Sequence, residues 1–307
     1  MRRLTYVAAL AAMTWWLIAA IAAGSAAAAT PYKDITSVGP LEHVYLGNEL
    51  SCQVAHTGDS ALEFYPPFTI PGDCGTFVVV GANLYAPDFV SHGVTATGSL
   101  GVYAPFTPVN QSNVTGTGSA ADPFRVVTDA DVGVTGLHIH ETDSYVIGDE
   151  AYRTDVAVSN TATAGISGIL YRAGDCYLGG SDVGYGFTET FGTRKAVGCS
   201  INPNNSPPGR IEEWVPLTGG NNFYETFYGS VWSWIGGHTS FPDTCDCTTF
   251  QDNGGGLSWT FDIAAGSSAT FRVRLHHGRS RLRVVMPTSQ TAPGYITGKS
   301  NVLAVTR

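Results

Sequence analysis

From Leu41 onward, apolar and polar residues alternate in short runs that Gly, Pro, Asn and Asp interrupt. Because successive side chains of a strand point to opposite faces, this alternation predicts half-buried β-strands. Turn residues recur roughly every 8 to 14 positions, which favours an antiparallel sandwich over a sheet with crossover helices. The predicted fold is therefore all-β, a large antiparallel β-sandwich. Its clearest predicted strands cover residues 77–80, 124–127, 136–139, 152–158, 166–171 and 257–263.

One segment departs from this pattern. Between residues 223 and 235, large apolar residues recur mostly at steps of three and four, which predicts one short amphipathic helix packed on a sheet. The alternative is an exposed aromatic row that stacks against sugar rings. In that interpretation Tyr224, Trp232 and Trp234 are the ligand-binding candidates.

Turn-rich stretches divide the chain. Residues 110–122 (NQSNVTGTGSAAD) contribute little to a core, so we predict a linker or loop there. It would separate an N-terminal β half, residues 30–109, from a C-terminal β-sandwich half, residues 123–271. Whether these halves form one domain or two is left open by length.

The first 29 residues have the pattern of a secretory signal peptide. Arg2 and Arg3 precede an apolar run over residues 6–23, and small residues follow up to Ala29. The charge holds the cytoplasmic side while the apolar run enters the membrane, and the small residues permit cleavage. The alternative is an uncleaved anchor, since about 20 apolar residues span a bilayer. We expect cleavage, a secreted or cell-surface-associated protein, and no membrane span afterwards.

Charge is unevenly distributed along the chain, which has a formal net charge of −9. All 25 acids lie between Asp34 and Asp262, whereas 7 of the 16 basic residues lie at or after Arg272. The acidic body would repel nucleic acid, so no nucleic-acid partner is expected. Residues 272–307 are predicted to be a basic, disordered tail, with binding to an anionic surface as the alternative.

Export makes disulfides the expected state of the cysteines. Closing a short loop costs the least entropy, which favours Cys52 with Cys74 and Cys176 with Cys199. Six cysteines are present, namely Cys52, Cys74, Cys176, Cys199, Cys245 and Cys247.

Cys245 and Cys247 are then left for each other or for a partner elsewhere. A bridge between them closes a small, strained ring, which we expect to be more reducible than the other two. A metal site that adds His238 is the alternative. Structural zinc usually requires two spaced Cys or His pairs, and this pattern is missing, so no metal is predicted there.

The densest group of functional side chains lies at residues 137–144 (LHIHETDS). On a strand, His138 and His140 point to one face about 7 Å apart, with Glu141 on the other face. Two such histidines are able to hold a metal, or one can act as a general base. A solvent-exposed polar face has the same pattern, and this interpretation is favoured.

Glu212 and Glu213 form a second catalytic candidate, because glycoside hydrolases use carboxylate pairs. Neighbouring residues of a strand face opposite sides, however, so the two cannot line one cleft. The catalytic candidates are therefore His138, His140, Glu141 and Glu212.

Other cofactor signals are weak. Asp129 and Asp131 (TDADVG) partly match a calcium loop, but the downstream bidentate Glu is missing. No cofactor is predicted, and calcium bound through Asp side chains and loop carbonyls is the alternative. Nucleophile-elbow, P-loop and dinucleotide-binding motifs do not occur in a credible context.

Several segments resemble a group of exported actinobacterial-type surface proteins of uncharacterised function. These are residues 50–67, 71–81, 144–161, 170–187 and 214–225, and residues after Phe271 do not share the likeness. Residues 152–161 have the form Tyr-x-x-x-Val-x-Val-x-Asn-Thr, which is similar to a strand of the two-sheet supersandwich in mutarotase-like and polysaccharide-lyase domains. The resemblance implies that fold and no specific activity.

The sequence therefore predicts a secreted or cell-surface β-sandwich that binds a glycan or another cell-wall component without catalysis. One alternative is a carbohydrate-active enzyme of the polysaccharide lyase or glycoside hydrolase type. The other is a structural or adhesion module with a protein partner. Oligomeric state has no signal in the sequence.

Overall fold

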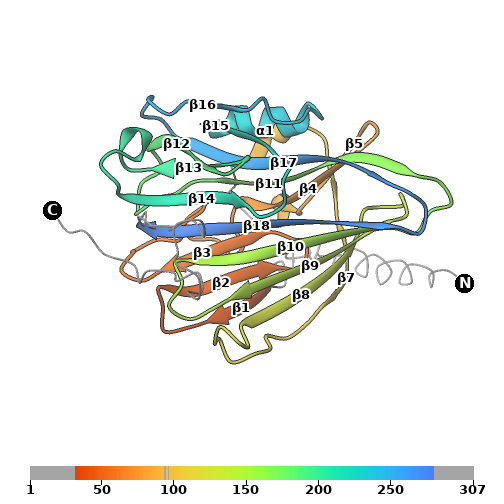
Figure 1. The fold of residues 1–307 in the computed structure, drawn as a ribbon, viewed down its shortest axis with the longest axis horizontal. Helices are drawn as coiled ribbons and strands as arrows, with labels where there is room; N and C mark the ends of the chain where they lie inside the picture. Colours follow the sequence, from red (N-terminus) through yellow and green to blue (C-terminus); the bar gives the residue numbers. More distant parts are fainter. Residues whose placement is uncertain (1–31, 93–94, 96, 280–307) are drawn as a thin grey trace, which may run out of the picture.

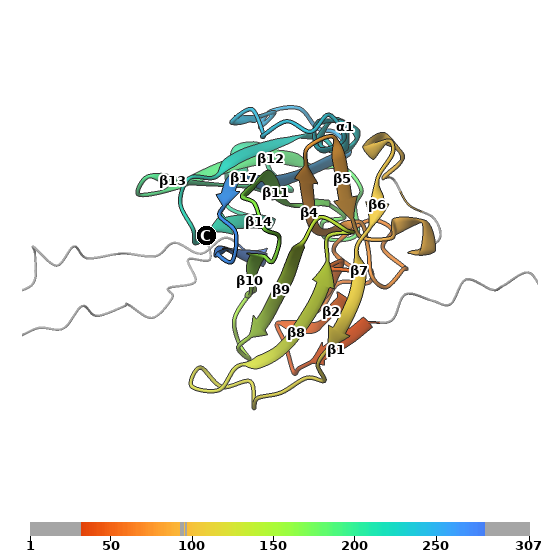
Figure 2. The ribbon, with the colours of Figure 1, turned by 90° about the vertical axis from the view of Figure 1, so that its right-hand side faces the viewer.

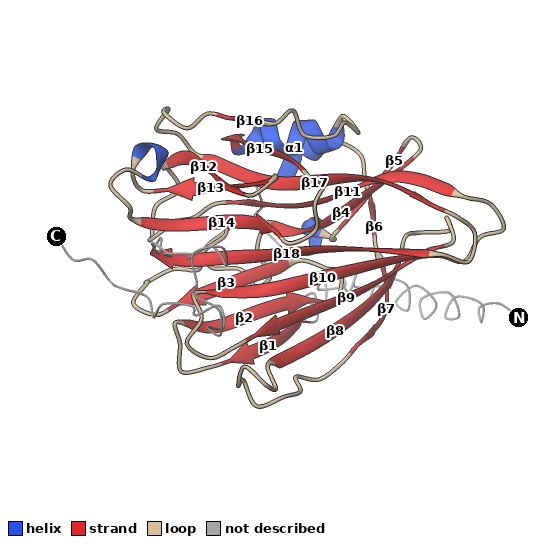
Figure 3. Ribbon diagram, viewed as in Figure 1, coloured by secondary structure: helices blue, strands red, loops and turns tan. Residues whose placement is uncertain are grey.

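A computed structural model describes residues 32–92, 95 and 97–279. The predicted signal peptide and residues 280–307 lie outside this part. Strands dominate and form three sheets, which confirms the all-β sandwich (Figures 1 and 3). Within the described residues, no helix has the length and apolar character needed to span a membrane.

The largest sheet is antiparallel and has eight strands. Its strand β10 alternates between buried and partly exposed residues over its full length, as the period-two pattern predicts. In spatial order the strands are β12 (Tyr185–Phe191), β13 (Arg194–Ser200), β14 (Arg210–Pro216), β18 (Ser268–Arg279), β10 (Ala151–Asn160), β9 (Leu137–Tyr145), β8 (Phe124–Asp131) and β7 (Thr107–Gln111).

The second sheet has seven strands and packs against the first. Its central strand β11 is buried on both faces over its second half. The core between the large sheets covers one face, and a second apolar cluster covers the other. In spatial order the strands are β16 (Thr244–Cys245), β15 (Asn222–Phe227), β17 (Asn253–Ile263), β11 (Ile166–Asp175), β4 (Cys74–Val80), β5 (Asn83–Ala86) and β6 (Ala104–Pro105).

A three-stranded sheet covers the remaining inner face of the eight-stranded sheet. The main-chain N–H of Leu41 donates a hydrogen bond of 3.2 Å to the hydroxyl of Tyr145. Val44, Ile139 and Leu170, one from each sheet, belong to the same buried core. Figure 2 shows the small sheet beside β8. Its strands are β1 (Tyr32–Thr36), β2 (Leu41–Gly47) and β3 (Cys52–His56).

The predicted short helix is present but starts later than expected. Residues 222–227 form β15, and α1 follows over Tyr228–Gly236. The helix lies on the outer face of the seven-stranded sheet (Figure 1), where a second apolar cluster forms between them. The short 3-10 helices are η1 (Phe89–His92), η2 (Thr97–Leu100) and η3 (Pro203–Asn205).

Trp232 lies inside this second cluster and is fully buried. Its ring centroid is 5.6 Å from that of Phe77 on β4 and 6.4 Å from that of Phe89. A buried ring cannot contact a glycan, so the expected ligand-binding role of Trp232 is wrong. Burial against the sheet is the reason for the helical spacing of its segment.

The two predicted halves share both large sheets. Residues 110–122 run from β7 into the loop before β8, and these two strands are hydrogen-bonded neighbours. Strand β4 pairs with β11 of the other half. The boundary expected at Arg272 falls inside β18, which lies between β10 and β14. Residues 272–279 are therefore part of a central strand and do not form a tail.

Three disulfides link all six cysteines, and they include both short-loop pairs favoured by the sequence. Cys52–Cys74 joins β3 to β4, and Cys176–Cys199 joins the residue after β11 to β13. The bonded pairs are Cys52–Cys74, Cys176–Cys199 and Cys245–Cys247.

Candidate functional site

Four aspartates meet at one end of the seven-stranded sheet. Asp73 directly precedes β4, Asp252 directly precedes β17, Asp175 ends β11, and Asp182 follows in the next loop. Because β11 runs antiparallel to both β4 and β17, these strand ends coincide. One oxygen atom from each of Asp175, Asp182 and Asp252 lies within 4.8 Å of the other two. We call the four residues the acidic site.

A repeated tripeptide positions two of these aspartates. Residues 72–74 and 174–176 both read Gly-Asp-Cys, and each cysteine is in a disulfide. The strand register places Gly174 opposite Cys74. The main-chain N–H of Asp175 donates a hydrogen bond of 3.0 Å to the carbonyl oxygen of Asp73. The two copies therefore meet, each next to a covalent cross-link.

The acidic site is shielded from water, although not closed. Asp73 and Asp175 are 0% and 1% exposed, whereas Asp182 and Asp252 are half-buried. One carboxylate oxygen, Oδ1, of Asp175, of Asp182 and of Asp252 is buried and finds no hydrogen-bond donor among the described residues. Native proteins rarely leave buried polar atoms without a hydrogen-bond partner, so we expect a ligand to bind these oxygens.

Burial and mutual repulsion change the protonation of these groups. Burial, followed by the charges of Asp252, Asp73 and Asp182, raises the pKa of Asp175 well above its usual value. Burial, followed by Asp182, raises the pKa of Asp252 to about 7. Burial also raises the pKa of Asp182. Loss of water and the close approach of like charges both disfavour the ionised form.

Two tyrosines flank the acidic site. The main-chain N–H of Tyr65 bonds to the carbonyl of Asp175 at 3.0 Å, and that of Tyr228 bonds to the carbonyl of Asp252 at 3.1 Å. Burial raises the pKa of both phenols, and the charges of Asp175, Asp182 and Asp252 raise it further. Both tyrosines are half-buried, so part of each remains open to a ligand.

Exposed aromatic rings continue the surface around the tyrosines. Phe227 is 43% exposed, and its ring centroid lies 4.6 Å from that of Tyr228. Phe250, two residues before Asp252, is 58% exposed and contacts Tyr185 with a centroid distance of 5.1 Å. Large exposed rings next to unsatisfied polar groups are typical of binding surfaces.

The predicted candidate Glu212 belongs to a different group, which we call the carboxylate–histidine cluster: Glu63, Arg210, Glu212 and His277. Nη2 of Arg210 donates to Oε1 of Glu63 at 2.7 Å, and Nδ1 of His277 lies 3.8 Å from Oε2 of Glu63. Glu63, Glu212 and His277 are each at most 1% exposed. A substrate therefore has no access to them in this structure.

Burial governs the charges in the carboxylate–histidine cluster. It raises the pKa of Glu212 well above the usual value, with Glu63 adding to the effect. It also lowers the pKa of His277 well below its usual value. Both shifts favour the neutral forms of Glu212 and His277, and Arg210 lies 2.7 Å from Glu63 in the same cluster.

His138 and His140 point to the same face of β9, as predicted, and this is the outer face of the eight-stranded sheet. Their side chains are 31% and 53% exposed. Nδ1 of His138 is 2.9 Å from Asp131, and Nδ1 of His140 is 2.8 Å from Asp129. Both aspartates lie within strand β8 and accept protein hydrogen bonds. The arrangement matches the solvent-exposed polar face, and the partial calcium-loop match at Asp129 and Asp131 lies in a paired strand.

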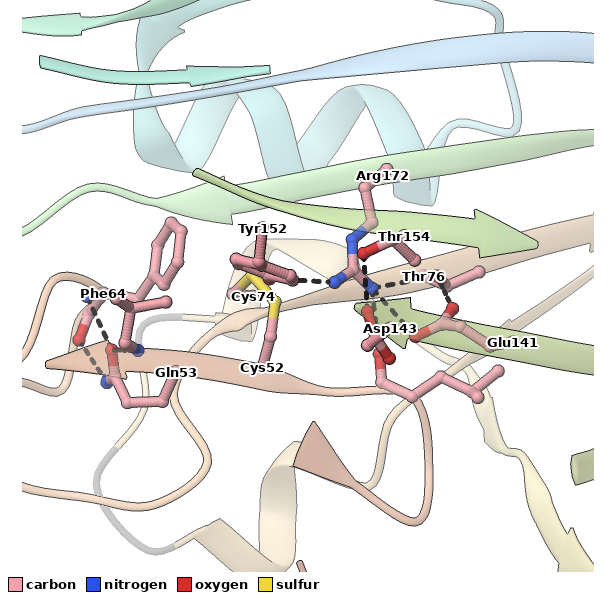
Figure 4. Close-up of a disulfide and its surroundings, with 12 residues drawn as sticks. Cys52, Gln53, Phe64, Cys74, Thr76, Glu141, Asp143, Tyr152, Thr154 and Arg172 are labelled. Atoms are coloured by element: carbon pink, nitrogen blue, oxygen red, sulfur yellow. Dashed lines mark hydrogen bonds and ion pairs between the residues drawn. A yellow bond between two sulfur atoms is a disulfide. The ribbon is translucent and has the colours of Figure 1, made fainter. Parts of the chain in front are cut away.

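Glu141 points the opposite way, into the sandwich (Figure 4). Nη1 of Arg172 on β11 lies 3.3 Å from Oε1 of Glu141 and 3.1 Å from the hydroxyl of Thr76. Nη2 of Arg172 donates to the hydroxyl of Tyr152 at 3.2 Å. Asp143 accepts a 2.6 Å bond from Thr154 in the same layer. Glu141 therefore ties β9 to β11 and does not face a substrate.

The register keeps the predicted acids apart. Glu141 lies opposite Val156, which lies opposite Phe271 of β18, whereas Glu212 lies opposite His277. Six residues of strand separate Phe271 from His277, or about 20 Å. His138, His140, Glu141 and Glu212 thus do not form one site.

Tyr224 and Trp234 are half-buried and contact each other, with ring centroids 5.4 Å apart. Nε1 of Trp234 donates to the carbonyl of Ser240 at 2.7 Å. Since Trp232 points into the core, the three rings do not form a common exposed row.

Three groups within the described residues have metal-ligand spacing. In one of them the sulfurs of Cys245 and Cys247 are bonded to each other, so they offer no thiolate. The second is the carboxylate–histidine cluster, with Glu63, Glu212 and His277. The third is the oxygen-only set of Asp175, Asp182 and Asp252. The repeated Gly-Asp-Cys tripeptide is a sequence signal for Asp175 of this last group, but not for Asp182 or Asp252.

The chain matches no protein-family model and no curated protein sequence. Among solved structures, it is similar to a candidate aldose 1-epimerase from Escherichia coli K12, with a TM-score of 0.41, 9% identity, and coverage of 82% of this chain and 100% of that one. It is also similar to a galactose mutarotase-related enzyme from Lactobacillus acidophilus, with a TM-score of 0.39, 8% identity, and coverage of 80% and 97%. A galactose mutarotase-like protein from Clostridium acetobutylicum gives a TM-score of 0.38, 7% identity, and coverage of 82% and 99%. Similarity of this size does not establish an activity.

Proposed function

We propose that this protein is an exported, non-catalytic β-sandwich that binds a neutral carbohydrate at the acidic site. The observation that carries the proposal is the half-buried group of Asp182, Asp252, Tyr65 and Tyr228, which lies over the buried Asp175. Sugar hydroxyls are hydrogen-bond donors, and a carboxylate oxygen is the acceptor that such a donor needs.

The aromatic rings support the same ligand class. A sugar ring has apolar C–H faces as well as hydroxyls, and exposed rings offer a matching apolar surface. Phe227, in ring contact with Tyr228, is 43% exposed, and Phe250, two residues before Asp252, is 58% exposed. A few convergent polar groups within an aromatic surround are the usual composition of a small-molecule site.

The charge of the site limits the ligand further. Burial and other acids shift the pKa values of Asp175, Asp182 and Asp252, and no cation is among the causes. Sulfated, phosphorylated and uronic polymers are bound mainly through cationic side chains, so they are disfavoured at this site. Neutral glycans are therefore the favoured class, and the disulfides are compatible with an extracellular location.

A glycan array probed with the full-length protein tests this proposal. We expect retention on neutral glycans, and at least tenfold weaker retention for Phe250→Ala and Tyr228→Ala. Phe191→Ala is the matched control, because Phe191 is 40% exposed but lies at the far end of β12 from Tyr185. Equal binding by all variants, or retention on no glycan, would contradict the proposal.

One observation favours a second candidate, hydrolysis of a glycosidic bond. Asp175, Asp182 and Asp252 combine raised carboxyl pKa values with mutual oxygen distances below 4.8 Å. Retaining glycosidases place an acid and a nucleophile about 5 Å apart. New reducing ends released from a bound glycan, and lost in Asp252→Asn, would favour this candidate over simple binding.

A further inference from the structure

We infer that Asp175, Asp182 and Asp252 bind a calcium ion at the base of the acidic site. Each contributes an oxygen within 4.8 Å of the other two, as three ligands of one ion require. The dependence of glycan binding on this ion rests on the proposed function. The ion site itself does not.

The second observation is the condition of Asp175. This side chain is 1% exposed, and its Oδ1 has no hydrogen-bond donor among the described residues. An ionised carboxylate without a partner in a buried position is costly. A divalent cation supplies the missing partner for Asp175 and for the shielded oxygens of Asp182 and Asp252 at once.

Other buried acids of the chain show the contrast. Glu141 has Arg172 and Thr76 as partners, and Glu63 has Arg210. Asp175 is equally buried, but one of its carboxylate oxygens lies within 4.8 Å of oxygens of two other aspartates. An arginine therefore balances Glu141 and Glu63, whereas no described residue donates to Oδ1 of Asp175.

The ligand set indicates the kind of ion. Carboxylate and carbonyl oxygens are hard ligands, which excludes the soft ligand chemistry of zinc or copper thiolate sites. Calcium binds six to eight oxygens at about 2.3–2.6 Å, so two of its ligands are separated by at most about 5 Å. Magnesium demands a tighter octahedron at about 2.0–2.1 Å, which loop residues such as Asp182 hold less readily.

Three aspartates leave part of a calcium coordination shell open. Water fills such positions in the absence of a ligand, and sugar hydroxyls are able to replace it. Tyr65 and Tyr228 flank the acidic site, so a hydroxyl that reached the ion would lie near aromatic rings. A sugar bound in this way would contact the ion through a hydroxyl and the tyrosine rings through its apolar face.

Calorimetric titration of the full-length, EGTA-treated protein with calcium chloride tests the ion site. We expect one saturable site per chain, at least tenfold weaker binding in Asp175→Asn and Asp182→Asn, and an increase in Tm with calcium. Asp262→Asn is the matched control, because Asp262 is exposed at the opposite end of β17 from Asp252. It should bind calcium like the wild type.

The far-ultraviolet spectrum of each variant checks folding, and Asp182→Asn in the half-buried loop keeps the test valid if Asp175→Asn unfolds. No saturable binding at millimolar calcium, unchanged affinity in both variants, or equal affinity for magnesium would each overturn the inference. Glycan retention that survives EGTA would overturn the dependence on the ion. Calcium binding without retention on any glycan would refute the proposed function and leave the ion site standing.

Discussion

The main-chain N–H of Asp175 donates a 3.0 Å hydrogen bond to the carbonyl oxygen of Asp73, which joins the two Gly-Asp-Cys copies. Each copy is also fixed by the disulfide of its cysteine, Cys74 or Cys176. The backbone under the acidic site is therefore held by two cross-links and by the pairing of β11 with both β4 and β17. A rigid backbone is what a group of mutually repelling carboxylates requires in order to stay assembled.

The first prediction concerns these cross-links. Removing Cys52–Cys74 or Cys176–Cys199 by double substitution to Ser should each cost about 3 kcal/mol of unfolding free energy, because each closes a loop of moderate length. These bonds span 22 and 23 residues, whereas Cys245–Cys247 spans 2. Urea unfolding of the oxidised proteins measures the difference. Equal losses for all three pairs would contradict the loop argument.

The second prediction concerns pH in the absence of calcium. Burial and Asp182 raise the pKa of Asp252 to about 7. The folded state then holds a proton that the unfolded state has lost, so folding stability falls as pH rises from about 4 through about 7. With EGTA present, urea unfolding should show lower stability at pH 8 than at pH 5. Calcium should reduce this fall, because it favours the ionised carboxylates.

Asp252→Asn provides the check on that assignment. An amide does not titrate, so the calcium-free variant should lose less stability than the wild type between pH 5 and pH 8. Asp262→Asn should retain the wild-type pH dependence, since Asp262 is exposed. If Asp252→Asn leaves the pH dependence of the unfolding free energy unchanged, other groups cause the effect. Asp143 is one such group, because burial and the charge of Glu141 raise its pKa to about 8.

The third prediction concerns the ion pair inside the sandwich. Arg172→Met should cost about 3–5 kcal/mol, because it leaves Glu141 buried without its positive partner. Arg153→Met is the control, since Arg153 is 43% exposed and its pair with Asp155 should contribute at most about 1 kcal/mol. Adding Glu141→Gln to Arg172→Met should recover part of the loss in urea unfolding. Strictly additive losses would mean that the two side chains are not coupled.

The strand pattern of the sequence explains why the fold was predictable. Tyr152 to Asn160 alternate along β10, and one face of that strand is buried throughout. The end of β18 is harder to predict, because basic residues such as Arg272 and Arg274 give it the composition of a tail. Their side chains alternate with Phe271, Val273 and Leu275, which are buried, so the same period was present there.

The site was less predictable, since it depends on contacts between distant segments. Asp73, Asp175 and Asp252 approach each other only because β4, β11 and β17 are neighbours, and strand order is not readable from local alternation. Glu141 illustrates the opposite error. Its position in a polar run favours a catalytic role, whereas its partner in the structure, Arg172, lies 31 residues later in another sheet.

The fourth prediction concerns the exposed histidine pair. His138→Ala and His140→Ala should each change the free energy of unfolding by less than about 1 kcal/mol, because their pairs with Asp131 and Asp129 are solvent-exposed. Glycan retention should be unchanged, since both residues lie on the outer face of the eight-stranded sheet. A tenfold loss of retention in either variant would move the binding surface to that face.

The fifth prediction separates the two tryptophans of α1. Trp232 is fully buried among Phe77 and Phe89, so Trp232→Ala should lower the free energy of unfolding by about 3–5 kcal/mol through lost packing and the cavity left behind. Trp234 is half-buried and bonds to the Ser240 carbonyl, so Trp234→Ala should cost less, about 1–2 kcal/mol. Urea unfolding measures both.

Binding distinguishes a packing role from a ligand contact in these variants. Under conditions where each protein is folded, Trp232→Ala and Trp234→Ala should retain wild-type affinity for calcium, because neither ring belongs to the acidic site. The first turn of α1 is the place where packing and site meet, since Tyr228 both begins the helix and bonds to Asp252. Weaker calcium binding in folded Trp232→Ala would show that the packing of α1 holds Asp252 in position.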